Sequence, residues 1–310
     1  MGGSRADSYS GGVVISVRTF RLVTGTALGS LCVIIFTGAL VRLTGSGLGC
    51  VDWPQCNESK FIDVSSGHTF IEQANRLFTG LVSLSVVLAV LTAHRARPKR
   101  SDLILCAWLL VLGVLAQVVI GGIVVLTGLN PFANMAHFLV SMVLIAVALV
   151  LYRRAGTAQP GDFFRDFPAR LRPMVAILFI LGTIVVVTGT VVTATGPHAG
   201  DEDAIRFGFE LTSVARVHGL SVVASLLLMG WLWWSMRRDA ALAEQRWSVS
   251  VLLGASLAQG AVGYTQYFTG VPVFLVGVHI IGATVFFLAL CNVVLAPRDP
   301  DGVVVAGDAY

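Results

Sequence analysis

His218 and His279 are the residues whose type and placement most strongly indicate a metal centre in this chain. They belong to two different long apolar segments and lie at similar depth in them. Two neutral imidazoles that face each other across a helix bundle can supply both axial ligands of a heme iron. Histidine suits several metals, but no carboxylate or thiolate cluster accompanies these two, which argues against zinc or a di-iron centre. The alternative is that each imidazole only hydrogen-bonds a neighbouring helix.

A second group of polar residues lies in the first half of the chain. Glu72, Asn75 and Arg76 begin an apolar segment at i, i+3 and i+4, so they share one helix face. His137 opens another segment. Ionisable residues at membrane depth are costly, and each is a functional hypothesis by default. The guanidinium groups of Arg76 and Arg216 suit heme propionates, and the alternative for Arg76 is an ion pair with Glu72.

Two cysteines, Cys50 and Cys56, lie in the loop 43–69. An oxidising compartment outside the membrane permits a disulfide between them. The bond would be a structural staple or, because the loop is short and exposed, an exchangeable redox pair. Arg42, just before the loop, is expected to extend its charge to water at the membrane surface.

These residues need helices to position them, and the composition indicates membrane helices. The 310 residues are 55% hydrophobic and 12% charged, with a mean hydropathy of +0.82. A soluble protein has about twice that charged fraction. A helix crosses a bilayer with roughly 20 apolar residues. Asn130-Pro131 and Gly270 with Pro272 interrupt two longer apolar stretches. The sequence therefore predicts an all-α integral membrane protein with eight spans: 20–42, 70–94, 102–126, 132–152, 173–195, 212–236, 247–269 and 272–296.

The distribution of Lys and Arg predicts the orientation. One side holds 16 of the 21 basic residues: Arg5, Arg18, Arg21, Arg95, Arg97, Lys99, Arg100, Arg153, Arg154, Arg165, Arg170, Arg172, Arg237, Arg238, Arg246 and Arg298. Both termini are therefore expected in the cytoplasm, with the polar residues near the outer face. The first nineteen residues show no signal or transit pattern, which favours a bacterial cell membrane. The pI near 9.0 reflects this bias, so no nucleic-acid partner is predicted.

The chain also repeats itself. Leu115-Ala116-Gln117, Gly121, Thr127-Gly128 and His137 recur 142 residues later, ending at His279. Thr37-Gly38 and Thr44-Gly45 recur as Thr188-Gly189 and Thr195-Gly196, and small residues seven apart on one helix face allow close helix approach. An even number of spans per half gives both halves the same topology. We expect two tandem four-helix bundles, with these boundaries: a tail 1–19, a first bundle 20–152, a cytoplasmic linker 153–172, a second bundle 173–296 and a tail 297–310.

The same residues resemble a known family. The segment 44–56, TGSGLGCVDWPQC, is similar to the first outer loop of heme A synthases. Glu72-x-x-Asn75-Arg76 resembles their Glu-x-x-His-Arg motif. Three histidines fall where the family's other histidines fall: His137, His218 and His279. The resemblance covers residues 20–296.

This resemblance implies an activity. The family oxidises a ring methyl group of heme O to a formyl group, giving heme A for a terminal oxidase. Successive hydroxylations would give a geminal diol that loses water. The resemblance implies a heme b cofactor on His218 and His279, and a substrate heme near Glu72 and His137. Glu72 would act as a base or stabilise developing positive charge.

The resemblance further implies heme O synthase and an electron donor in the membrane as partners. The chain departs from the pattern at Asn75, where many members have a histidine, so His137 alone is the simplest ligand set for the substrate heme. It also departs in the loop 197–210, which is acidic and lacks the second cysteine pair of some members. A rival function is a non-enzymatic b-type cytochrome, which has no use for Glu72. A transporter with parallel repeats would break its helices at mid-membrane, whereas the prolines lie at segment ends.

Overall fold

The computed structural model describes residues 15–157 and 167–295. These residues form eight long α-helices, one short 3-10 helix (Ala240–Leu242) and no β-strand: α1 (Val17–Leu43), α2 (Gly67–Arg95), α3 (Ser101–Leu126), α4 (Pro131–Arg154), α5 (Arg172–Thr195), α6 (Leu211–Met236), α7 (Ala243–Phe268) and α8 (Val273–Val294). The predicted all-α class is confirmed. The two predicted tails lie largely, and the predicted linker partly, outside the described residues.

The helix breaks fall where turn residues interrupt the apolar stretches. Asn130 caps α4 because its Oδ1 accepts the backbone N–H of Phe132 at 2.9 Å, and Pro131 occupies the first turn. Gly128 has φ +61 and Gly270 has φ +79, the left-handed conformation that glycine adopts easily. The residue after each glycine is also left-handed. The same turn therefore joins α3 to α4 and α7 to α8, 142 residues apart.

Seven of the long helices in the described part of the chain are apolar enough to cross a membrane: α1 to α6 and α8. With this pattern the chain is a multi-pass membrane protein. α7 has the length of a span but not the same hydropathy, because it carries Gln, Ser, Gly and Tyr among its apolar residues. It packs against both α6 and α8.

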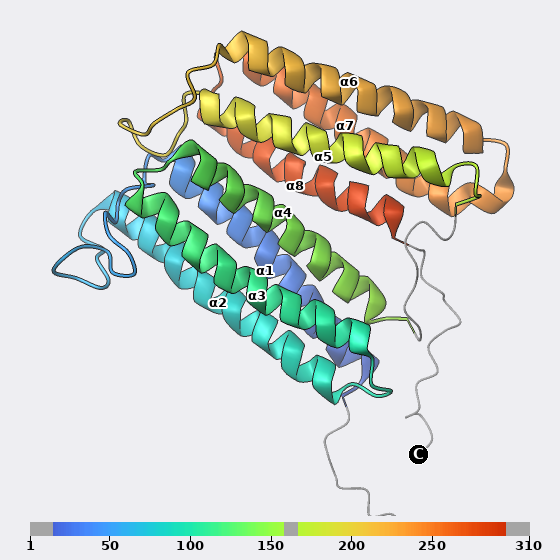
Figure 1. The fold of residues 1–310 in the computed structure, drawn as a ribbon, viewed down its shortest axis with the longest axis horizontal. Helices are drawn as coiled ribbons and strands as arrows, with labels where there is room; N and C mark the ends of the chain where they lie inside the picture. Colours follow the sequence, from blue (N-terminus) through green and yellow to red (C-terminus); the bar gives the residue numbers. More distant parts are fainter. Residues whose placement is uncertain (1–14, 158–166, 296–310) are drawn as a thin grey trace, which may run out of the picture.

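Helix contacts follow the same order in both halves. α1 packs against α2 and α4, and α3 packs against α2 and α4. In the same way, α5 packs against α6 and α8, and α7 against α6 and α8. Figure 1 shows α1 to α4 gathered on one side and α5 to α8 on the other. The two groups meet where α8 contacts α1 and α4, and where α4 contacts α5.

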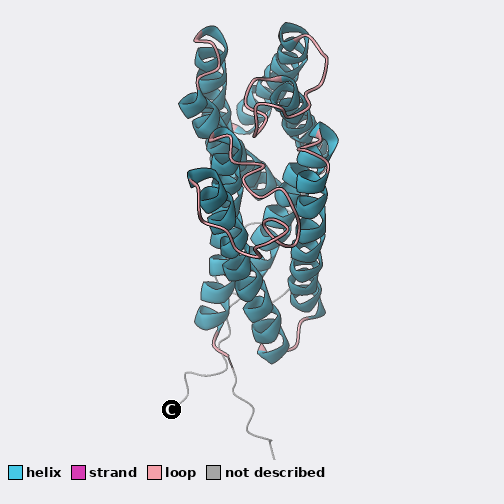
Figure 2. Ribbon diagram, turned by 90° about the vertical axis from the view of Figure 1, so that its left-hand side faces the viewer, coloured by secondary structure: helices cyan, strands magenta, loops and turns pink. Residues whose placement is uncertain are grey.

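The loops that follow α1, α3, α5 and α7 gather at one end of the molecule (Figure 1). Figure 2 looks onto this end, where the longer loops lie across the helix ends. We call this the loop end. All the candidate polar residues named above lie in the helix turns close to it or in the loops themselves.

One prediction about the repeated Thr-Gly pairs is wrong. Thr44 is the C-cap of α1 and Gly45 follows with φ +66, so this pair ends the helix instead of lining it. A Cβ added to Gly38 would meet no atom within 4 Å, whereas one added to Gly189 would lie 3.2 Å from Cε1 of His218. At Gly113 of α3, by contrast, an added Cβ would lie 2.3 Å from Cδ2 of Leu144 on α4, so glycine is needed there for the two helices to pack.

Candidate functional site

The loop between α1 and α2 is closed by a disulfide. Cys50 and Cys56 are joined with an S–S distance of 2.01 Å, as the sequence predicted. Both cysteines are fully buried (0% exposed), so the expectation of an exposed pair is wrong. The loop covers them because it is fastened to the helices on both sides. Exchange of this disulfide with an external thiol therefore requires the loop to open.

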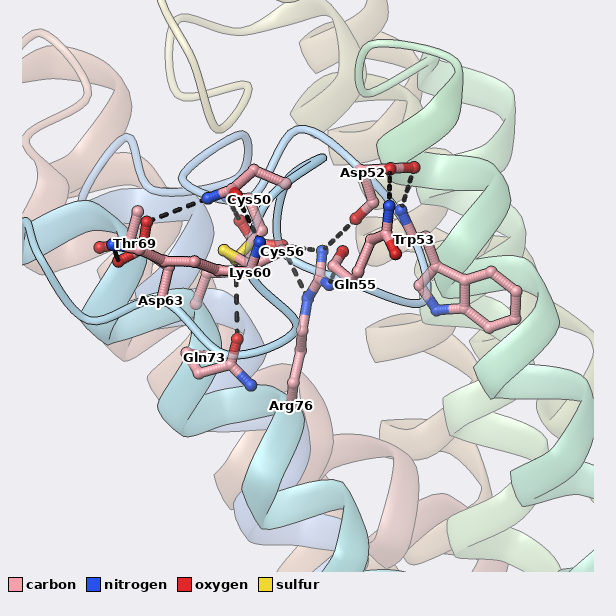
Figure 3. Close-up of a disulfide and its surroundings, with 12 residues drawn as sticks. Cys50, Asp52, Trp53, Gln55, Cys56, Lys60, Asp63, Thr69, Gln73 and Arg76 are labelled. Atoms are coloured by element: carbon pink, nitrogen blue, oxygen red, sulfur yellow. Dashed lines mark hydrogen bonds and ion pairs between the residues drawn. A yellow bond between two sulfur atoms is a disulfide. The ribbon is translucent and has the colours of Figure 1, made fainter.

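Trp53 fastens the loop to α3. Its indole lies against Gly122, where an added Cβ would be only 2.7 Å from Cδ2 of the ring. Glycine is required at this position because any side chain would displace the indole. The Asp52 carboxylate completes the turn by accepting the backbone N–H of Trp53 at 2.7 Å and the side-chain amide of Gln55 at 2.8 Å (Figure 3).

Glu72 fastens the loop to α2. Glu72 is buried, with 5% of its surface exposed, and its Oε2 accepts a hydrogen bond from the backbone N–H of Cys50 at 2.7 Å. Its Oε1 accepts Nε of Arg76 at 3.0 Å and Nη2 at 2.6 Å. Three donors thus stabilise a negative charge on this carboxylate, while burial opposes it. The predicted shared face of Glu72 and Arg76 is confirmed, and so is the ion pair that was the alternative role for Arg76.

Arg76 reaches from α2 into the loop, as Figure 3 shows. Besides Glu72, it donates from Nη1 to the carbonyl of Gln55 and from Nη2 to the carbonyl of Asp52, both at 3.2 Å. Four of the five N–H donors of a guanidinium are then in use. Arg76 therefore holds the catalytic candidate and the loop together, and it has little capacity left for a propionate.

Asn75 and His218 occupy matching places. In the second half, the Thr188 hydroxyl of α5 lies 3.0 Å from Nδ1 of His218 on α6. In the first half, the Thr37 hydroxyl of α1 donates to Oδ1 of Asn75 on α2 at 2.8 Å. The two threonines are the repeated ones found in the sequence, but sequence reasoning assigned them to helix packing. Their role toward His218 and Asn75 was missed.

His137 and His279 also occupy matching places. Nε2 of Gln117 donates to the carbonyl of His137 at 2.9 Å, and Nε2 of Gln259 donates to the carbonyl of His279 at 2.8 Å. Both rings lie against a repeated glycine of the preceding helix, Gly121 or Gly263. Nothing in the described part of the chain hydrogen-bonds either ring, and each Nδ1 is buried without a partner. These two imidazoles are not the satisfied packing residues of the alternative interpretation.

The second half fits a heme iron with two histidine ligands. The contact of Nδ1 of His218 with Thr188 leaves Nε2 available and fixes the ring, as second-shell partners of ligating histidines do. The ring of His279 has no hydrogen-bond partner in the described part of the chain. Among residues 15–157 and 167–295 no group of three or more His, Cys, Asp or Glu could hold a metal ion.

Arg216 does not join this site through any contact. It is exposed, and no hydrogen bond or ion pair involves it among residues 15–157 and 167–295. Its role at a propionate stays a prediction. No hydrogen bond joins His137 to Glu72 or Asn75 either, so no contact in the structure links these first-half residues to each other.

Arg42 corrects another expectation, because it points to the second half instead of extending to water. Its Nη2 donates to the carbonyl of Thr193 at 2.7 Å and its Nε to the carbonyl of His198 at 2.5 Å. Gly47 N–H donates to the carbonyl of Gly200 at 2.9 Å beside it. We call these contacts the inter-half clamp. A lone arginine at a helix end gave no sequence signal that could separate a clamp from a surface charge.

Asp63 organises the far side of the disulfide loop. It accepts the backbone N–H of Ser65 and the side-chain amide of Asn57, both at 3.0 Å, and forms an ion pair with Lys60 at 3.3 Å. Hydrogen bonds from Ser65, together with Lys60, lower the pKa of Asp63 to about 2. This carboxylate therefore stays charged at physiological pH.

Comparison with known proteins identifies the family. The model of the family COX15-CtaA, described as cytochrome oxidase assembly protein, matches residues 21–291, which is most of the chain. The match includes both halves and the disulfide loop between α1 and α2.

Individual relatives match either over a shorter part of the chain or with a lower sequence identity. A heme A synthase of Geobacillus thermodenitrificans is 37% identical over 134 residues, which is 40% of this chain and 41% of that protein. A heme A synthase of Exiguobacterium sibiricum is 30% identical over 160 residues, 51% of this chain and 54% of that protein. A heme A synthase of Listeria welshimeri is 26% identical over 287 residues, 86% and 91% of the two chains. The more similar relatives are thus matched over about half of their length or less.

Proposed function

The chain belongs to the COX15-CtaA family of cytochrome oxidase assembly proteins, and from this premise we propose that it oxidises a methyl group of heme O to a formyl group, giving heme A for a terminal oxidase. The relatives named heme A synthase support this reaction. In this proposal the halves α1 to α4 and α5 to α8 are tandem four-helix bundles of the same topology. The repeated helix contacts and the repeated turn support that arrangement.

One asymmetry carries the proposal. Both halves have an imidazole without hydrogen bonds at the same place, but in the described part of the chain only the helices of the first half carry a buried carboxylate, Glu72 of α2. At the offset that relates Asn75 to His218, the second half has Ala215 instead of Glu72. A half with two histidines and no acid suits a permanent electron carrier. A half with an acid suits a substrate, so we assign heme b to the second half and heme O to the first.

The site residues then have separate tasks. His218 and His279 would hold heme b, which when bound supplies electron transfer for the oxidation. His137 would position the substrate heme. In each hydroxylation the methyl carbon would lose one hydrogen as a proton and two electrons, which the electron carrier of the membrane would accept. Glu72 would take a proton from the water whose oxygen bonds to that carbon, or stabilise the positive charge that develops there. Arg76 and the N–H of Cys50 hold the carboxylate in one orientation for that task.

The surroundings follow from the same assignment. We propose that the loop end faces the outside of a bacterial cell membrane and that both termini are cytoplasmic, because the basic residues gather at the opposite end. A heme O synthase would supply the substrate, and an electron carrier in the membrane would serve heme b. The isoprenoid tail of the substrate can remain in lipid while its ring reaches the first half.

The test is Glu72→Gln, which keeps the side chain's size and removes the charge. We expect normal heme b content, with heme O or a hydroxylated intermediate accumulating and heme A formation lowered by roughly a hundredfold or more. The measurement is heme extraction and chromatography from cells that express the variant. Gln73→Ala, which changes the neighbouring buried residue on α2, is the matched control. Wild-type heme A per bound heme b in Glu72→Gln would reject the role of Glu72, and no heme A from the wild type would favour the b-type cytochrome.

A further inference from the structure

The first half lacks one of the two imidazoles that the second half presents. Thr188 holds His218 and Thr37 holds Asn75 through hydroxyl contacts of 3.0 and 2.8 Å, on equivalent pairs of packed helices. The carboxamide thus occupies the place of a ligating ring. The first half keeps a single unbonded imidazole, that of His137.

The surroundings of two equivalent glycines differ because Asn75 has a shorter side chain than His218. A Cβ on Gly189 would lie 3.2 Å from Cε1 of His218, so this glycine makes room for the imidazole. A Cβ on Gly38, the residue after Thr37, would meet nothing within 4 Å. The first half therefore keeps the glycine gap without the ring that fills it in the second half.

The carboxamide has chemistry different from that of an imidazole. Because Thr37 donates to Oδ1, the Nδ2 group of Asn75 is the end that remains available. No residue in the described part of the chain accepts a hydrogen bond from Nδ2. The lone pair of an amide nitrogen is delocalised, and the group presents two N–H donors. It is suited to donate hydrogen bonds and unsuited to ligate iron.

We propose that the heme held by His137 has one protein ligand, and that Asn75 is a hydrogen-bond donor on its open axial side, where a small molecule such as water or an anion binds. Thr37 is a positioning residue that directs Nδ2 to that side. The inference rests on the proposed function only in placing a heme in the first half. It makes the two hemes of one chain differ: the first is open to small ligands and the second is closed.

The experiment uses the full chain purified from cells that make heme O, with azide as the probe. Electron paramagnetic resonance of the ferric protein should show one high-spin and one low-spin heme, and azide should convert only the high-spin signal. Asn75→His should replace the high-spin signal with a second low-spin one and abolish azide binding. Asn75→Leu should leave the heme high-spin and weaken azide binding roughly tenfold, the effect of losing one hydrogen bond to a charged group. Thr37→Val should weaken azide binding by a smaller factor.

The controls separate this inference from the proposed function. The low-spin signal of the second half reports folding in the variants of Asn75, Thr37 and His137. Thr188→Val should perturb that signal while leaving azide affinity unchanged. Two low-spin hemes in the wild type, or an unchanged azide affinity in Asn75→Leu, would overturn the inference alone. A single heme per chain that is insensitive to His137→Ala would overturn the first-half heme site, and with it both the inference and the proposed function.

Discussion

The two halves of this protein use one scaffold for two different local chemistries. Each has an imidazole without hydrogen bonds, held through its carbonyl by a glutamine, and each has a threonine that contacts the side chain opposite. The first half then differs by a buried ion pair, an asparagine and a disulfide loop, all of which gather on or above α2.

Under the proposed function, the difference separates the contacts of the scaffold from those of the reaction. Contacts present in both halves, such as Gln117 with His137 and Gln259 with His279, then serve to hold a heme. Contacts present in one half only, such as those of Glu72, are not needed to hold a heme. A buried carboxylate and its guanidinium partner carry a desolvation cost that packing alone does not require. We infer that they are retained for chemistry.

The largest expected effect is a difference between the alanine variants of His279 and His137. His279→Ala should remove the low-spin heme b and, with it, heme A. His137→Ala should keep the low-spin signal while heme O accumulates and heme A falls by at least about a hundredfold, because a lost ligand costs more than a lost second-shell partner. Reduced-minus-oxidised spectra and heme extraction measure both. Identical results for the two variants would remove the functional division between the halves.

The disulfide sharpens the comparison, because only the first-half loop has one. The double variant Cys50→Ser with Cys56→Ser removes the disulfide that links residues six positions apart, a bond that stabilises such a loop by about 2 kcal/mol. Without the disulfide, the backbone N–H of residue 50, which donates to Glu72, is no longer held in place. Heme A formation should fall roughly tenfold while the low-spin signal stays unchanged. Heme extraction from membranes measures the ratio. Cys32→Ala, a free cysteine in α1, should change neither, and a loss of the low-spin signal in the double variant would show that the loop serves both halves.

The inter-half clamp tests whether the halves are independent. Arg42→Gln removes charged hydrogen bonds to the carbonyls of Thr193 and His198 and should lower the free energy of unfolding by about 2 kcal/mol. Thermal unfolding in detergent measures it. Arg95→Gln, an exposed arginine at the opposite end of the molecule, should have no effect. An equal, small effect of both variants would mean that the clamp adds nothing to the contacts of α8 with α1 and α4.

Much of this architecture was predictable from local sequence signals. The ends of every predicted span lie within about four residues of the ends of an observed helix. Asn130-Pro131 and Gly270 contribute to this agreement because they stop helices through their own backbone preferences. The disulfide and the matched histidines followed from spacing and repetition. The apolar composition of the chain predicted a helical membrane fold, since each backbone polar group inside a membrane needs a partner in its own segment.

Side-chain partners across the fold could not be predicted in the same way. Arg42 lies at a helix end where a charge normally reaches water, and only the folded loop brings the carbonyl of His198 to it. The disulfide loop is docked by Trp53 against Gly122, a residue nearly seventy positions further along the chain. Thr37 and Thr188 were visible as a repeat, but a hydroxyl's partner depends on which helix packs opposite.

The smallest expected effect concerns the pH dependence of the disulfide loop. The pKa of Asp63 is lowered from its ordinary value of 3.8 to about 2 by hydrogen bonds from Ser65 and by Lys60. A lowered pKa means that the charged form stabilises the folded loop above pH 3.8, and that this stabilisation is lost as the pH falls toward 2. Reduction of the buried Cys50–Cys56 bond by a phosphine should therefore accelerate about threefold between pH 5 and pH 2.5, since opening of the loop limits it. Asp63→Asn should react at the faster rate at both pH values, because its amide resembles the protonated acid. If that variant kept the wild-type pH dependence, Asp63 would not be the group that controls the loop.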